Sequence, residues 1–176
     1  LAYRCDAYED FVLSVGRLDR AKRVDLLLEA AAAEPSVHVV IAGEGPDRER
    51  LEQVAQKHNL DGRADFRGRV DASELADLYA RCGAVYYAPV DEDYGMVPYE
   101  AFLAEKPVVT TTDAGGPLDV VSDRRTGLVA APRADALADA LRYLRDHPDD
   151  GRAWGRAGKS VAERVTWDAA IERLLS

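Results

Sequence analysis

The sequence has 176 residues, of which 47% are hydrophobic and 31% are charged, and its formal net charge at pH 7 is −9. This length predicts one domain of a soluble globular protein with a sizeable core. The acidic balance argues against nucleic acid or an anionic membrane as the main partner of this region.

Apolar runs and helical stretches alternate along the chain. The first two apolar runs, 11–15 and 37–42, are nearly continuous, which is typical of parallel strands covered on both faces. Between them, the stretch 24–31 has helical composition and periodicity. After the second run, Asp47 is placed to cap a helix that continues to about His58.

The later segments continue this alternation. Strands are predicted at 11–15, 37–42, 65–67, 84–88, 108–111 and 127–129. Helices are predicted at 24–31, 47–58, 73–79, 98–104, 118–121, 135–146, 149–163 and 168–176. Ser73 is expected to open the third of these helices. The order predicts a doubly wound, Rossmann-like α/β fold, in which helices cover both faces of one parallel sheet.

The stretch from Glu92 to Glu100 joins a predicted strand to a predicted helix. Such loops are where open α/β sheets bind ligands. Pro98 suits the first helical turn, the free N–H groups of that turn attract phosphate, and Gly95 lets a ligand approach the backbone. A carboxylate accepts two hydrogen bonds side by side, so Glu92 and Glu100 are each suited to hold two hydroxyls of a ribose or a sugar ring. The stretch therefore predicts a nucleotide-sugar site.

Two glutamates separated by seven residues, with the pair Tyr94-Gly95 between them, resemble the signature of the retaining glycosyltransferases of family 4. These enzymes have the GT-B fold, which consists of two Rossmann-like domains with the active site between them. Other segments resemble the family in the same order, namely Lys106-Pro107-Val108-Val109, Gly115-Gly116 and Thr126-Gly127-Leu128-Val129.

The resemblance covers nearly the whole chain but only the C-terminal half of these enzymes. It implies that residues 1–176 are the donor-binding domain, and that an N-terminal, acceptor-binding domain is its partner. In the family the last helix crosses back to that N-terminal domain, and the segment 168–176 resembles it.

Gly16-Arg17-Leu18, followed by Lys22, resembles the family motif Gly-Arg-Leu…Lys. A guanidinium gives paired donors and an ammonium gives a point charge. The resemblance implies that both cations bind the diphosphate and stabilise its charge as it leaves, in place of a metal ion. Where the family usually has glycine after the lysine, this sequence has Arg23.

The resemblance also assigns the remaining site residues. Glu100 is expected to bind the ribose hydroxyls, and Glu92 is expected to lie at the transferred sugar or the reaction centre. The backbone after Gly68 is expected to recognise the base. Two interpretations of Tyr94 remain open: its phenolic oxygen contacts a sugar hydroxyl, or its ring belongs to the core with only the hydroxyl in water. The predicted catalytic residues are Glu92, Arg17 and Lys22, and the predicted nucleotide-sugar-binding residues are Gly16, Arg17, Lys22, Arg69, Val70, Tyr94, Gly95, Met96, Val97 and Glu100.

The resulting functional prediction is a donor-binding domain that serves hexose transfer from a nucleoside-diphosphate sugar to a glycan or lipid. GDP-mannose is slightly favoured over UDP-glucose, and no metal or other cofactor is expected. Without its N-terminal domain the chain is expected to be inactive. A nucleotide-sugar epimerase of the same fold is a second interpretation, although the Arg…Thr-Glu-Arg-Pro-Glu stretch of such enzymes is not found. A third is a docking module that binds through Trp167, Ile171 and Leu174.

A few features of the sequence bear on the cellular location of the protein. Cys5 and Cys82 are far apart and have no metal-ligand spacing, so we expect reduced thiols. No apolar run reaches the roughly 20 residues that span a bilayer, and no stretch resembles a signal peptide. We therefore expect a cytoplasmic protein, and the family allows peripheral association of the full enzyme with the inner face of the membrane. The start at Leu1 rather than Met leads us to expect a piece of a larger protein.

Overall fold

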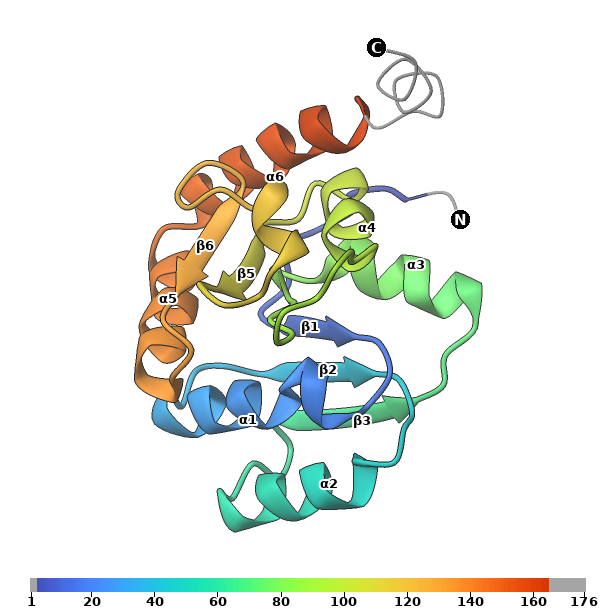
Figure 1. Ribbon diagram of the computed structural model, residues 1–176, viewed down its shortest axis with the longest axis vertical. Helices are drawn as coiled ribbons and strands as arrows, with labels where there is room; N and C mark the ends of the chain where they lie inside the picture. Colours follow the sequence, from blue (N-terminus) through green and yellow to red (C-terminus); the bar gives the residue numbers. More distant parts are fainter. Residues whose placement is uncertain (1–2, 165–176) are drawn as a thin grey trace.

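The computed structural model describes residues 3–164, and its centre is one sheet of six parallel strands (Figure 1). The strands are β1 Val12–Val15, β2 Val39–Ala42, β3 Ala64–Gly68, β4 Ala84–Tyr86, β5 Val108–Thr111 and β6 Gly127–Ala130. Their order in the sheet is β3-β2-β1-β4-β5-β6. The chain winds outwards from β1 in one direction and from β4 in the other, so the point between β1 and β4 is the topological switch point, where such sheets bind ligands. The predicted doubly wound fold is confirmed.

In the described region, six α-helices and two short 3₁₀ helices lie between the strands or after the last of them. The α-helices are α1 Val24–Ala33, α2 Arg48–Lys57, α3 Ala72–Arg81, α4 Val97–Leu103, α5 Ala134–Asp146 and α6 Pro148–Ala162. The 3₁₀ helices are η1 Arg20–Lys22 and η2 Gly116–Asp119. None of the helices within residues 3–164 has the length and apolar character needed to cross a bilayer. The predicted helix 168–176, with Trp167, Ile171 and Leu174, lies outside the described residues.

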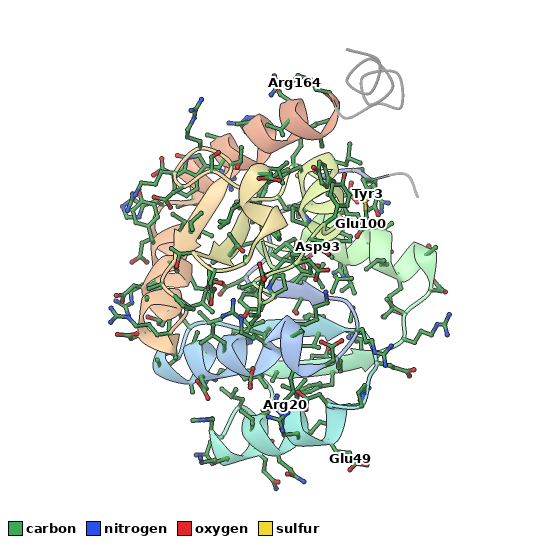
Figure 2. All side chains as sticks on the ribbon, in the orientation of Figure 1. Tyr3, Arg20, Glu49, Asp93, Glu100 and Arg164 are labelled. Carbon is green, nitrogen blue, oxygen red and sulfur yellow. The ribbon has the colours of Figure 1, made fainter. Side chains whose placement is uncertain are left out.

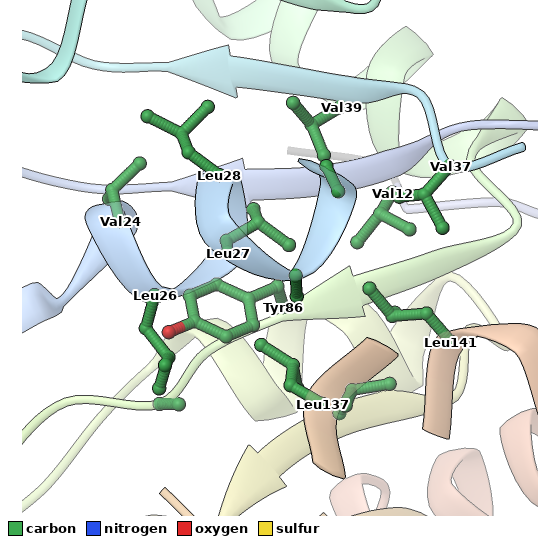
Figure 3. Close-up of a cluster of buried hydrophobic side chains, with 14 of the residues drawn as sticks. Val12, Val24, Leu26, Leu27, Leu28, Val37, Val39, Tyr86, Leu137 and Leu141 are labelled. Atoms are coloured by element: carbon green, nitrogen blue, oxygen red, sulfur yellow. The ribbon is translucent and has the colours of Figure 1, made fainter. Parts of the chain in front are cut away.

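Two hydrophobic clusters cover the two faces of the sheet. Val12 belongs to one cluster and Leu13 to the other, as expected because successive strand side chains point to opposite faces. On the first face, the ring of Tyr86 lies among Leu27 of α1 and Leu137 of α5 (Figure 3). On the second face, α4 and α6 pack against each other (Figure 1). Both faces are therefore buried, which explains the continuous apolar runs in the strands.

Two helix starts differ from the sequence prediction. The carboxylate of Asp71, rather than Ser73, caps α3, because it accepts hydrogen bonds from the backbone N–H groups of Ser73 and Glu74 at 2.8 and 2.9 Å. Asp47 does stand before α2, but its side chain accepts no capping hydrogen bond. It pairs instead with Arg50 one turn later. A neighbouring carboxylate therefore replaces Ser73 as the cap of α3, and a neighbouring arginine keeps Asp47 from capping α2.

Candidate functional site

The loop after β1 carries the first group of predicted site residues to the carboxyl edge of the sheet. Asp19 caps η1 by accepting a hydrogen bond from the backbone N–H of Lys22 at 3.2 Å. The side chain of Arg17 is 73% exposed, and its nearest carboxylate, that of Asp19, is 3.9 Å away. Arg17 is therefore available to a ligand, whereas Lys22 is turned inwards.

Lys22 forms an ion pair with Glu92, which lies in the loop after β4. The ammonium group also lies 3.4 Å from the hydroxyl of Tyr87. Burial opposes the positive charge, but the hydrogen bond to Glu92 and the contacts with Tyr87 outweigh it, so the pKa of Lys22 is raised. Two predicted catalytic residues, 70 positions apart, thus meet at the switch point of the sheet.

The backbone around Glu92 is held by the loop after β5. Its N–H donates to the carbonyl of Ala114 at 3.1 Å, and its carbonyl accepts from Gly116 at 2.6 Å. Gly115 has φ +76°, and a Cβ atom there would lie 2.7 Å from the carbonyl oxygen of Glu92. Only glycine fits this contact. The Gly115-Gly116 segment therefore fixes the position of Glu92.

Glu100 lies in the first turn of α4, and its Oε2 accepts a hydrogen bond from the hydroxyl of Tyr79 at 2.8 Å. Tyr79 is fully buried. Burial, followed by the charge of Glu100, raises the pKa of Tyr79 well above its usual value. Tyr3 packs edge-on against Tyr79 and lies beside Glu100 (Figure 2). Sequence reasoning missed Tyr79, because a tyrosine at helical spacing in an apolar face looks like an ordinary core residue.

The loop before α4 presents two exposed side chains, Tyr94 and Met96, each 58% exposed. The ring of Tyr94 stacks on that of Tyr99 with centroids 5.7 Å apart. Of the two interpretations of Tyr94, the buried core ring is wrong. The structure gives a packing reason for Gly95, since a Cβ atom there would lie 2.5 Å from the ring of Tyr87. Its predicted role in ligand binding stays a prediction.

Arg69 and Val70 follow β3, at the edge of the sheet. Between them and the switch point stands the loop after β2. Gly43 and Gly45 let this loop pack on the loop after β1, because a Cβ at either would lie about 2 Å from a carbonyl oxygen there. The predicted residues therefore fall in two groups, with Gly16, Arg17, Lys22, Glu92 and the segment 94–100 near the switch point and Arg69 and Val70 to one side.

Arg23 was not predicted as a site residue. Its φ is +49°, a left-handed conformation that costs a residue other than glycine about 1–2 kcal/mol. The sequence did contain a signal for this position, because Arg23 stands where the family usually has glycine. The side chain of Arg23 reaches the loops after β4 and β5. The hydroxyl of Tyr86 donates to the backbone carbonyl of Arg23 at 2.8 Å.

A cavity of about 160 Å³ lies at the opposite edge of the sheet, where Phe11, His38, Leu141 and Arg145 are among the residues that line it. A smaller pocket lies at the switch point and is lined by Gly16, Arg17, Lys22 and Tyr87, among others. Only the smaller pocket contains predicted site residues. Within residues 3–164, no group of three or more His, Cys, Asp or Glu side chains is arranged to hold a metal ion.

The family model for glycosyl transferases group 1 matches residues 5–161. The chain is 33% identical over 176 residues to the D-inositol 3-phosphate glycosyltransferase of Mycobacterium avium (strain 104), a match that covers 96% of this chain and 41% of that relative. The sucrose-phosphate synthase of Thermosynechococcus elongatus has 30% identity and a TM-score of 0.85, over 95% of this chain and 45% of that one.

HepE of Anabaena, solved in complex with UDP-glucose, has 25% identity and a TM-score of 0.84, over 94% of this chain and 48% of that one. The chain thus spans less than half the length of these relatives. These structural neighbours are GT-B glycosyltransferases, and the Rossmann-like sheet of this chain matches a part of each of them. On these matches, the chain belongs to the glycosyl transferases group 1 family.

Proposed function

We propose that this chain is the C-terminal, donor-binding domain of a retaining glycosyltransferase of family 4. The enzyme would move a hexose from a nucleoside-diphosphate sugar to a glycan or lipid acceptor. The observation that carries the proposal is the ion pair of Lys22 and Glu92 at the switch point of the sheet, with the exposed Arg17 on the same loop. This arrangement supplies two cations for a diphosphate and a carboxylate for a sugar within one site.

The proposed reaction breaks the bond between the sugar carbon and the diphosphate oxygen and forms a bond between the same carbon and a hydroxyl oxygen of the acceptor. The proton of that hydroxyl passes to the leaving diphosphate. The bonding electrons remain on the diphosphate, whose negative charge therefore increases. Arg17 and Lys22 are proposed to stabilise this charge by donating hydrogen bonds to the leaving diphosphate. The diphosphate replaces Glu92 as the partner of Lys22, and the carboxylate of Glu92 then binds the hydroxyls of the transferred hexose. In this proposal the two cations take the role of a metal ion, no cofactor is used, and the nucleoside-diphosphate sugar is the donor substrate.

The other end of the donor is proposed to bind at α4 and β3. Oε2 of Glu100 already accepts a hydrogen bond from Tyr79, and its second oxygen is proposed to accept from the ribose hydroxyls. The backbone of Arg69 and Val70 is proposed to contact the base, and the N–H groups of residues 95–97 to contact the diphosphate or sugar. Gly16 leaves room for the diphosphate beside the backbone.

The identity of the donor and acceptor is part of the proposal. HepE was solved with UDP-glucose, which supports a UDP-hexose, while GDP-mannose remains the other candidate. The acceptor would be bound by an N-terminal domain, without which the chain would transfer no sugar. The proposed location is the cytoplasm, with the full enzyme at the inner face of the membrane.

The test is a thermal shift assay of the chain with UDP, GDP and ADP. A ligand at a hundred times its dissociation constant stabilises by about 2.7 kcal/mol, which raises the Tm of a domain of this size by roughly 5–10 °C. One nucleotide is expected to shift the unchanged chain and not Glu100→Ala. The control is Glu49→Ala, an exposed glutamate on α2, which should keep the shift. The proposal is wrong if no nucleotide raises the Tm at millimolar concentration.

A further inference from the structure

We propose that Arg23 is a positioning residue of the donor site. With Asp113, it holds together the loops that follow β1, β4 and β5, so that Lys22 and Glu92 both face the diphosphate end of the donor. This inference rests on the proposed function, because it assigns a role within the same site.

The guanidinium of Arg23 first joins the loop after β1 to the loop after β4. Its Nε donates to the carbonyl of Ala88 at 2.8 Å, and its Nη2 donates to the carbonyl of Pro89 at 2.8 Å. Lys22 directly precedes Arg23, and Glu92 lies three residues after Pro89. The two members of the ion pair are therefore on backbones that Arg23 ties to each other.

The same guanidinium then joins these loops to the loop after β5. Nη1 and Nη2 donate to the two carboxylate oxygens of Asp113 at 2.9 and 2.8 Å, a paired geometry that lysine does not provide. Nη2 also donates to the hydroxyl of Thr111 at 2.6 Å. The hydrogen bond from Arg23 is the main reason why the pKa of Asp113 is lowered.

Asp113 passes this restraint to Glu92 through the backbone. The carbonyl of Asp113 accepts from the N–H of Asp91 at 3.1 Å, and the carbonyl of the next residue, Ala114, accepts from the N–H of Glu92 at 3.1 Å. The Arg23–Asp113 pair therefore fixes Glu92 from its own loop and from the neighbouring one.

The burial of Arg23 distinguishes positioning from direct contact. Its side chain is only 15% exposed, and its five hydrogen bonds occupy all three nitrogens of the guanidinium. Arg17, on the same loop, is 73% exposed. Arg17 is thus the cation that meets the ligand, and Arg23 is the cation that shapes the loop. The left-handed backbone at Arg23 is strained, and these side-chain contacts hold it.

The experiment measures the affinity of the chain for UDP and UMP, and for GDP and GMP, by titration calorimetry. Arg23→Gly suits the left-handed backbone and removes the whole side chain with its guanidinium. Because Lys22 and Glu92 are then less well placed, the ratio of diphosphate to monophosphate affinity is expected to fall about tenfold. Asp113→Asn should lower the ratio in the same direction, and the double variant should add little to either. Arg23→Lys should recover only part of the loss.

The matched control is Glu34→Gln, which alters a carboxylate held by Arg142 and Arg145 away from the site. It should leave the ratio unchanged. If Arg23→Gly does not fold in a thermal scan, Asp113→Asn carries the test. Equal ratios for the unchanged chain and these variants, or an equal loss of monophosphate and diphosphate affinity, would overturn this inference and leave the proposed function intact. Absence of binding by the unchanged chain would overturn the proposed function and this inference with it.

Discussion

Lys22 and Glu92 neutralise each other across the switch point of the sheet, and their side chains are 23% and 24% exposed. The ammonium that is proposed to bind phosphate is thus paired with the carboxylate that is proposed to bind the sugar. A partly buried pair is screened less by salt than a surface pair. In the proposed function, the diphosphate of the donor therefore has to displace Glu92 from Lys22 when it binds.

Replacing Glu92 by Gln should strengthen the binding of UDP or GDP, because the phosphate no longer competes with a carboxylate for Lys22. We expect severalfold tighter binding, measured by titration calorimetry. In the proposed two-domain enzyme the same change should abolish sugar transfer. Glu44→Gln removes an exposed carboxylate from the loop after β2 and is the control for net charge. Unchanged or weaker diphosphate binding by Glu92→Gln would contradict the exchange.

Replacing Arg17 by Ala should weaken diphosphate binding about tenfold without destabilising the chain. Its side chain is 73% exposed and 3.9 Å from Asp19, and surface substitutions of this kind usually change the unfolding free energy by less than about 0.5 kcal/mol. Titration calorimetry and thermal unfolding measure the two quantities. Arg20→Ala, at another exposed arginine of the same loop, should leave binding nearly unchanged. Similar losses in both variants would point to net charge rather than to a specific contact.

Replacing Tyr79 by Phe should both destabilise the chain and weaken nucleotide binding. The hydroxyl is buried and donates to Glu100 at 2.8 Å, so its removal should cost about 1–2 kcal/mol of unfolding free energy in urea and leave the glutamate less well oriented. Tyr143→Phe removes a hydroxyl that donates to Asp150 at 2.6 Å, on the helices α5 and α6. That variant should lose stability but keep its nucleotide affinity. Equal nucleotide affinities of Tyr79→Phe and the unchanged chain would remove Tyr79 from the site.

Glu34 should make the chain sensitive to acid. Hydrogen bonds from Arg142 and then from Ser36 lower the pKa of Glu34 from 4.5 to about 2. Since the carboxylate binds its proton more weakly in the folded chain, its contribution is present above pH 4.5 and is lost as the pH falls towards 2. Tm measured from pH 6 to pH 2 should fall less steeply for Glu34→Gln than for the unchanged chain. Parallel curves would show that the carboxylate does not contribute.

The fold followed closely from local patterns in the sequence. Nearly continuous apolar runs, alternating with helical periodicity, predicted a parallel sheet covered on both faces, and residues 3–164 show it. Local competition was harder to predict. Asp47 stands at the start of α2 as expected, but Arg50 takes its carboxylate. Asp71 rather than Ser73 caps α3. Whether a side chain caps a helix depends on which of several nearby partners it reaches. The residue types alone do not predict that partner.

The sequence by itself determined the doubly wound architecture and the residue types at the carboxyl edge of the sheet, because strand periodicity and loop composition are local properties of the chain. Only the tertiary structure decided which of these residues touch. Lys22 meets Glu92, Arg23 meets Asp113 and Tyr79 meets Glu100. These contacts join separate loops or elements. They depend on how neighbouring loops and helices pack against one another in three dimensions, which local patterns of the chain do not specify.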